Sequence, residues 1–150
     1  MLDQLLDSFV RQLMHIVAKR LLKMKLLKCP ICGNVVEMVE DHGVPLMCCG
    51  KKMEEVEAGA VDAALEKHVP VLKVEGDCLT AVVGDVLHPM TPEHLISNIW
   101  IEFADGSNKK VTLTSDDEPI AKFNIAGKSG KATVYEYCNL HGLWKTEIEL

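Results

Sequence analysis

The stretch KCPICGNVVEMVEDHGVPLMCCG, residues 28–50, sets Cys29 and Cys32 in one close pair and Cys48 and Cys49 in a second. A CxxC turn presents two sulfurs to one ion, and another close pair completes a tetrahedron of thiolates. The turn-forming residues between the pairs predict a miniature β module that is too small to bury a core unaided and therefore depends on its metal. Thiolates suit iron and zinc alike, so a structural zinc site remains an alternative at this point.

A second set of donors mixes imidazoles with one sulfur: His68, His88, His94, Cys138 and His141. Two prolines stiffen the loop from His88 to His94, which lowers the entropy lost when both rings are fixed on an ion. A lone histidine is ordinarily a surface or core residue, but five donors near the loops of one small domain predict a metal site. Because this set can leave a coordination position open, the two sites together indicate electron transfer to a reactive iron.

Cysteine makes up 6 of the 150 residues, too few for a disulfide scaffold. The adjacent Cys48–Cys49 pair would form a strained ring if oxidised, so reduced, metal-bound thiolates in a cytoplasmic protein are expected. The net charge of −6 conceals an asymmetry, because residues 1–28 hold six Lys or Arg against two Asp, which leaves 10 Lys or Arg against 20 Asp or Glu elsewhere. This acidic body repels phosphate backbones and argues against nucleic-acid binding.

Apolar residues recur at helical spacing near the N-terminus, with acidic residues early and basic residues late. Residues 2–26 are therefore predicted to form an amphipathic helix. Packing or a dimer contact is its expected role, and peripheral membrane contact is the less favoured alternative. Asp3, Asp7 and the lack of a continuous apolar centre argue against a cleavable secretory signal.

The predicted organisation is a helical extension at 1–27, a cysteine module at 28–53, an acidic linker at 54–65 and a larger β domain at 66–150. Seven strand-like runs separated by turn signals predict an antiparallel β-sandwich for that domain. These runs are residues 69–74, 79–83, 99–103, 110–113, 122–125, 133–137 and 144–148.

Four motifs stand out when the chain is read as a whole. They are Cys29-x2-Cys32-x15-Cys48-Cys49-Gly50, Glu66-Lys67-His68-Val69-Pro70, His88-Pro89-Met90-x3-His94 and Tyr137-Cys138-Asn139-Leu140-His141-Gly142. Their combination resembles desulfoferrodoxin, the two-iron class of superoxide reductase, from about Lys28 to the C-terminus. Residues 1–27 are additional to the family pattern, and Trp100 lies later than the tryptophan expected after the second loop histidine.

The resemblance implies a desulforedoxin-like module with an Fe(Cys)4 centre, followed by an immunoglobulin-like, neelaredoxin-like sandwich with a square-pyramidal iron. For that iron it implies four equatorial nitrogens and an axial sulfur opposite an open position, from His68, His88, His94, His141 and Cys138 respectively. The implied reaction reduces superoxide to hydrogen peroxide with one electron and two protons and releases no dioxygen. The resemblance also implies rubredoxin or a similar small electron donor, and a homodimer.

Two further residues acquire a role from the motif that contains them. Lys67 is the candidate for attracting the superoxide anion and organising a proton-donating water. Glu66 matches the family's carboxylate that can occupy the sixth position of the oxidised iron. Outside this motif, the two would be an ordinary solvated pair. Cys78 matches no ligand position and is predicted to be a strand residue.

Two other functions remain alternatives. One is an electron-transfer protein whose mixed-ligand centre is a closed relay, which predicts no rapid reaction with superoxide. The other is a zinc-ribbon interaction protein that holds a partner through its N-terminal helix. That alternative leaves the five donors after residue 66 unexplained.

Overall fold

The computed structural model describes residues 24–60, 63 and 65–150, and the chain divides between Glu55 and Val56 into two compact units. Strands dominate both, and the described residues contain one short helix, α2 (Leu65–His68). The predicted mainly β class is therefore confirmed. The helix predicted for residues 2–26 lies outside the described residues up to residue 23. Within the described part of the chain, no helix is long and apolar enough to cross a membrane.

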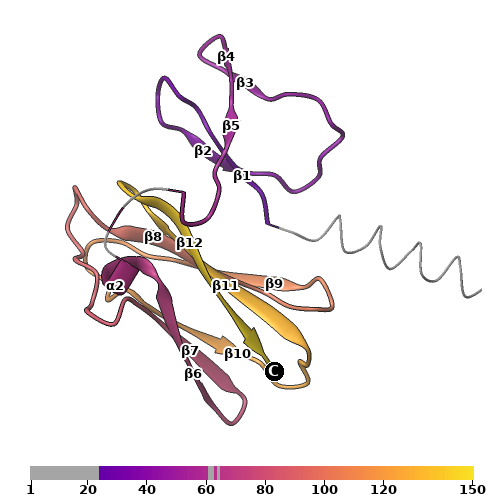
Figure 1. Ribbon diagram of the computed structural model, residues 1–150, viewed down its shortest axis with the longest axis vertical. Helices are drawn as coiled ribbons and strands as arrows, with labels where there is room; N and C mark the ends of the chain where they lie inside the picture. The colour runs from indigo at the N-terminus through magenta and orange to yellow at the C-terminus, as the bar shows by residue number, and fades with distance from the viewer. Residues whose placement is uncertain (1–23, 61–62, 64) are drawn as a thin grey trace, which may run out of the picture. The chain divides into compact units, whose positions relative to one another are not determined.

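The described residues of the first unit form five short strands: β1 (Leu26–Lys28), β2 (Val35–Glu37), β3 (Met47–Cys48), β4 (Lys51–Lys52) and β5 (Glu54–Glu55). Strand β1 lies between β2 and β5 in an antiparallel sheet, and β3 pairs with β4 in a separate hairpin (Figure 1). The buried cluster of this unit consists of Leu27, Cys29 and Met53. So small an apolar cluster offsets little chain entropy, as expected for a module that a metal holds together.

The strands of this unit extend past two predicted boundaries. The prediction assigns Leu26 and Leu27 to the helical extension, but they form β1, pair with Glu37 and Val36, and are buried. Sheet pairing and burial override the helical spacing of the apolar residues at this point. The prediction also places Glu54 and Glu55 in a linker, whereas they form β5 against β1. Two exposed glutamates give no apolar sign of a strand, and backbone pairing alone places them in the module.

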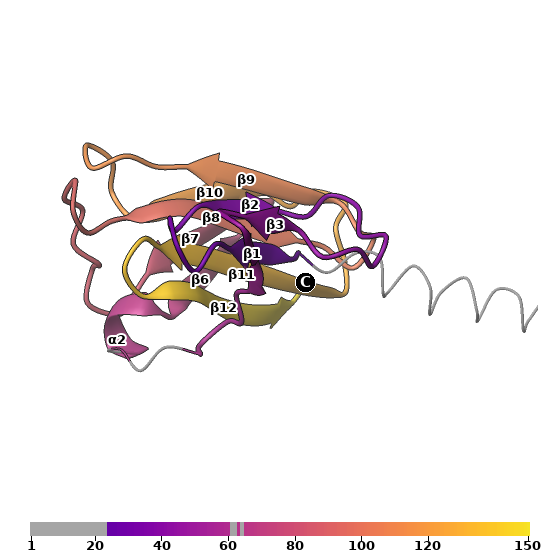
Figure 2. The ribbon, with the colours of Figure 1, turned by 90° about the horizontal axis from the view of Figure 1, so that it is seen from above.

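The described residues of the second unit form seven antiparallel strands in two sheets of order β10-β7-β6 and β12-β11-β8-β9. Figure 1 shows the sheets as two layers, and they overlap when seen from above in Figure 2. Each strand overlaps one of the seven predicted runs, so the predicted strand content is confirmed. The strands are β6 (Pro70–Glu75), β7 (Cys78–Val83), β8 (Ile96–Glu102), β9 (Asn108–Thr112), β10 (Ile120–Asn124), β11 (Lys131–Cys138) and β12 (Gly142–Glu149).

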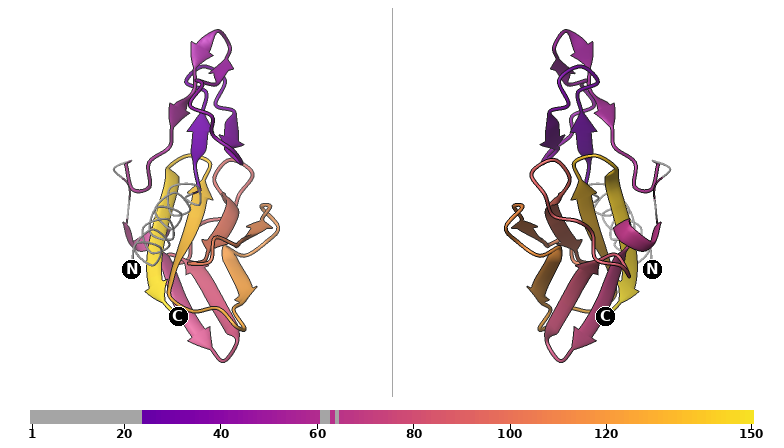
Figure 3. Two further views of the ribbon diagram at one scale, coloured as in Figure 1. Left: turned by 90° about the vertical axis from the view of Figure 1, so that its right-hand side faces the viewer. Right: turned by 90° about the vertical axis from the view of Figure 1, so that its left-hand side faces the viewer.

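The core of the second unit lies between its two sheets, because both contribute to one apolar cluster. Strand β7 buries Leu79, Ala81 and Val83 and leaves the residues between them partly exposed, as a strand with one face on a core does. The opposite layer contributes side chains from β8 and from the long β11–β12 hairpin, orange to yellow in Figure 3. Cys78 begins β7 as the predicted strand residue, and Trp100 is buried in β8.

Candidate metal centres

The four sulfur atoms of the first unit gather around one point. Cys29 directly follows β1, Cys32 closes the CxxC turn, Cys48 ends β3, and Cys49 lies in the turn to β4. Cys48 Sγ is 3.7 Å from Cys32 Sγ and 3.9 Å from Cys49 Sγ. A tetrahedron with metal–sulfur bonds of about 2.3 Å has edges of about 3.8 Å. The donor set therefore fits one tetrahedral ion.

The turn between β3 and β4 has an unusual backbone conformation. Cys49 and Gly50 have φ angles of 51° and 72°, and a two-residue hairpin of type I′ requires positive φ at both positions. Glycine adopts that conformation readily, whereas for a cysteine it is unfavourable. Among the described residues, Cys49 is the one non-glycine residue with positive φ. We attribute this strained position to the requirement that two adjacent sulfurs face the same ion.

Local hydrogen bonds prepare one thiolate in this cluster. The backbone N–H groups of Cys32 and Ile31 donate to Cys29 Sγ at 3.5 and 3.4 Å and lower the pKa of Cys29 to about 6. The neighbouring thiols of Cys29 and Cys32 raise the pKa of Cys48 to about 12. Metal binding at neutral pH therefore meets one thiolate already formed and has to displace protons from neighbouring sulfurs.

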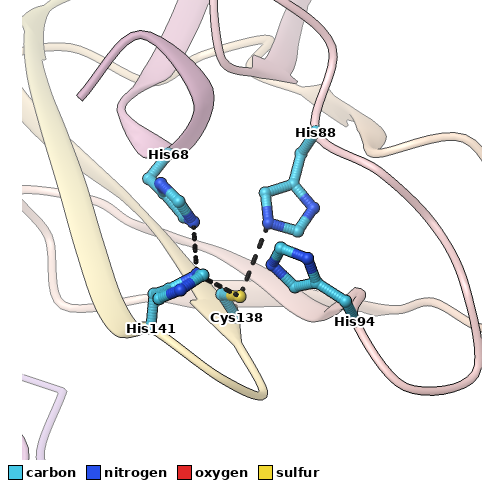
Figure 4. A group of neighbouring side chains, drawn as sticks. All are labelled: His68, His88, His94, Cys138 and His141. Carbon is cyan, nitrogen blue, oxygen red and sulfur yellow. Dashed lines mark hydrogen bonds between the residues drawn. The ribbon is translucent and has the colours of Figure 1, made fainter. Parts of the chain in front are cut away.

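The five donors of the second unit come from three connections that meet at one end of the sandwich. His68 ends α2, His88 and His94 lie between β7 and β8, and the turn from Cys138 to His141 joins β11 to β12. Their ligand atoms all lie within 4.8 Å of one another. Figure 4 shows the four rings and the sulfur facing a common centre.

The four imidazole rings form the corners of a square. Taken in the order His68, His88, His94, His141 and back to His68, neighbouring ring centroids are 4.9, 4.5, 5.0 and 4.7 Å apart, and neighbouring planes meet at 72–80°. The diagonal from His68 to His94 is longer, 6.5 Å. Metal–nitrogen bonds of about 2.1 Å place opposite nitrogens about 4.2 Å apart. The rings therefore fit the equatorial positions of a single ion.

Hydrogen bonds and burial identify the nitrogens that face the centre. His88 Nδ1 donates to Pro89 O at 2.6 Å, which leaves Nε2 as the acceptor 3.5 Å from Cys138 Sγ. His68 Nε2 lies 2.9 Å from His141 Nδ1. His94 Nε2 is buried and has no hydrogen-bond partner within the described structure, as expected of a nitrogen whose partner is a metal.

Burial keeps two of these imidazoles, His88 and His94, neutral and available. It lowers the pKa of His88 to about 4, and it lowers the pKa of His94 together with the nearby His141, His68 and Lys67 charges. Burial also raises the pKa of Cys138, although the backbone N–H groups of His141 and Leu140 favour its thiolate. Neutral imidazole and thiolate are the forms that bind metals.

Two residues that the sequence analysis missed hold the ligands in place. The Trp144 ring stacks on His68 with centroids 5.2 Å apart, and its Nε1–H donates to His141 O at 3.2 Å. Asn139 fixes the loop that carries His94, because its Oδ1 accepts from Leu95 N at 3.0 Å and its Nδ2 donates to Glu93 O at 2.9 Å. In the sequence, this role was indicated only by position: Asn139 lies inside the Cys138–His141 motif, and Trp144 follows it closely.

Glu66 and Lys67, the two predicted residues outside the ligand set, lie exposed on α2 just before His68. Burial is the main cause that lowers the pKa of His94, and the nearby Lys67 charge adds a small contribution in the same direction. The structure thus brings together all nine predicted metal donors in two clusters and places the Glu66–Lys67 pair at the edge of the second.

Comparisons with known proteins match both parts of the chain. The family model described as desulfoferrodoxin matches residues 60–147, and that of the desulfoferrodoxin N-terminal domain matches residues 22–56. A desulfoferrodoxin from Syntrophotalea carbinolica is 44% identical over 126 residues, covering 83% of this chain and 97% of the relative. One from Nitratidesulfovibrio vulgaris is 46% identical over 121 residues, covering 80% and 93%. The crystal structure of the superoxide reductase from Treponema pallidum has a TM-score of 0.65 and 31% identity, covering 83% and 98%.

Replacing Cys29 with serine tests the dependence of the first unit on its metal. Because Cys29 is the buried, preformed thiolate, Cys29→Ser is expected to lower the metal content from about two ions per chain to about one and to remove the hydrogen-exchange protection of β1. The sandwich amides remain protected. Cys78→Ser is the matched control, since Cys78 lies outside both clusters. Retention of both metals in Cys29→Ser would contradict the assignment.

Replacing Asn139 with alanine tests the support of the second centre. Loss of its two side-chain hydrogen bonds frees the His94 loop and is expected to weaken metal binding at this centre about 10- to 100-fold, measured by chelator competition. Asn124→Ala is the control, because Asn124 also accepts from a backbone N–H group, that of Ala126 at 2.9 Å, but lies at the end of β10. Equal metal affinity of the second centre in both variants would show that Asn139 does not support the His94 loop.

Proposed function

Because the chain belongs to the desulfoferrodoxin family, we infer that it is a superoxide reductase. Each superoxide takes up one electron and two protons and becomes hydrogen peroxide, without release of dioxygen. The observation that carries this conclusion is the convergence of four imidazoles and one buried sulfur on one point. A zinc-ribbon protein has no need for that donor set, and a closed relay has no need for the coordination position that five donors leave open.

The protein holds two irons, one in an Fe(Cys)4 centre and one in an Fe(His)4(Cys) centre. We propose Cys29, Cys32, Cys48 and Cys49 as ligands of the first and His68, His88, His94, His141 and Cys138 as ligands of the second. When bound, the second iron supplies the electron for superoxide, and its thiolate ligand makes that electron easier to give. In this proposal Cys138 supplies the sulfur, 3.5 Å from His88 Nε2 and 3.6 Å from His141 Nδ1, and the substrate would take the position that the five donors leave open.

The residues of α2 serve the substrate and its protons in this proposal. The Lys67 ammonium attracts the superoxide anion in an otherwise acidic protein and holds a water that donates a proton. The Glu66 carboxylate covers the open position when superoxide is absent. Support comes from their place directly before His68 and from the effect of the Lys67 charge on His94.

We also propose a location, an oligomeric state and an electron donor for the protein. None of the six cysteines forms a disulfide, which supports a cytoplasmic location, where thiols stay reduced. Exposed apolar side chains on the first unit, including Ile31, Val39, Val44 and Met47, support a homodimer formed through this module. The closed all-thiolate centre supports one-electron exchange with a small donor such as rubredoxin. The sandwich is proposed as the superoxide reductase domain, with an immunoglobulin-like topology.

Product analysis tests the function directly. The protein is reduced under anaerobic conditions and challenged with stoichiometric superoxide, and both peroxide and dioxygen are quantified. The expected yield is about one peroxide per superoxide consumed, with no dioxygen. Dioxygen at half the superoxide consumed would identify dismutation instead, and a slow reaction would favour the relay.

Replacing Lys67 with alanine tests the steering role. Lys67→Ala is expected to slow the second-order reaction with superoxide roughly tenfold or more and to weaken its dependence on ionic strength, because a positive charge beside the site is lost. Pulse radiolysis measures the rate, and the visible spectrum shows that both irons remain. Lys122→Ala removes the same charge from β10 and leaves the rate unchanged. An unchanged rate in Lys67→Ala would exclude the residue from the mechanism.

A further inference from the structure

The turn that follows β7 lies against the backbone that carries Glu66 and Lys67. Gly84 N–H donates to Val69 O at 3.2 Å, and Val86 N–H donates to Glu66 O at 3.1 Å. Helix α2 has four residues, and a single helical turn is not stable by itself. The position of α2 therefore depends on contacts such as these two hydrogen bonds.

Gly84 is the residue that permits this close approach. Its φ is +84°, and a Cβ atom there would lie 2.5 Å from Val86 O, 2.8 Å from Glu66 O and 2.8 Å from Lys67 Cα. All three are backbone atoms, which cannot turn aside as the end of a flexible side chain can. A side chain at residue 84 would therefore push the β7 turn and α2 apart.

We propose that Gly84 is a positioning residue for superoxide reduction. Its missing side chain lets the β7 turn hold α2 where the Lys67 ammonium stands beside the open position of the second centre. This inference rests on the role proposed for Lys67 above. The Lys67 Cα is the anchor of the side chain that carries the ammonium group, and it is one of the atoms that a Cβ at residue 84 would strike. A displacement of about 1 Å at a reacting group can cost a factor of about 100 in rate.

A double-mutant cycle separates positioning from general destabilisation. Gly84→Ala is expected to slow the reaction with superoxide about as much as Lys67→Ala, roughly tenfold or more, and to weaken the ionic-strength dependence equally. The double variant is expected to be no slower than Lys67→Ala alone, because a displaced lysine and a missing one have the same effect. The proposal would be overturned if the fold-losses of the two single variants multiplied in the double variant. It would also be overturned if Gly84→Ala kept the ionic-strength dependence of the wild type.

Gly127→Ala is the matched control. Gly127 has a similar φ of +70°, but nothing lies within 4 Å of its added Cβ. Gly127→Ala therefore has the backbone strain of an alanine at positive φ without the close contact. Its rate of reaction with superoxide is expected to equal that of the wild type. A loss in Gly127→Ala as large as that in Gly84→Ala would assign the effect to strain and refute positioning.

Hydrogen exchange, measured on the protein loaded with zinc, tests the position of α2 in the absence of turnover. Gly84→Ala is expected to lower the protection of the Val86 amide, which donates to Glu66 O, and to leave the core amide of Val134 protected. Unchanged protection of the Val86 amide would refute the proposal that the β7 turn holds α2 in position. If wild-type protein forms no peroxide, the proposed function fails, while this exchange result still decides whether Gly84 holds α2.

A second variant covers the case in which Gly84→Ala loses its second metal. Val86→Pro removes the N–H donor to Glu66 O and keeps glycine at residue 84. It is expected to retain both irons and to show the same fall in rate and in ionic-strength dependence. A wild-type rate in metal-loaded Val86→Pro would overturn the proposal.

Discussion

Five donor atoms from distant parts of the chain lie within 4.8 Å of one another, and the second unit is organised around that convergence. His68 and His141 are 73 residues apart, yet their Nε2 and Nδ1 atoms lie 2.9 Å from each other. The sandwich achieves this because α2, the β7–β8 loop and the β11–β12 turn all lie at one end of a single core. A rigid core limits the error in each ligand position, which matters because coordination tolerates only a few tenths of an ångström.

The same packing settles the charge state of the site. Four imidazoles this close would repel one another if protonated, and burial favours their neutral form at His88 and His94. Glu136, two residues before Cys138, is fully buried, and burial raises its pKa to about 9, so its carboxyl is neutral at pH 7. A carboxylate there would add a second negative charge beside the Cys138 thiolate. The positive charge of Lys67, by contrast, lies at the exposed edge, where it can act on an approaching anion.

Strand-like runs between turn signals predicted all seven strands of the sandwich, and strands such as β7 show the alternation of a face that packs on the core. Motif spacing predicted both donor sets because the residue type alone determines which atoms can bind a metal. Leu26 and Leu27 were assigned to the helical extension because apolar spacing cannot show that partners 11 and 9 residues away on β2 will pair with them. Gly84 went unnoticed for a related reason: a turn glycine is common, and only the backbone that crosses it shows why no side chain fits there.

The two centres differ most in how their sulfur is placed, and this difference assigns their tasks. Cys32 and Cys49 are exposed, so the first centre meets solvent through thiolates and has no position left for a substrate. Cys138 is buried, and the backbone N–H groups of Leu140 and His141 favour its thiolate. Hydrogen bonds to a thiolate withdraw part of the electron density that it gives to its metal. Since one of those donors belongs to a ligand, the Cys-x-x-His turn sets the position of the His141 ring and the donor strength of the sulfur together.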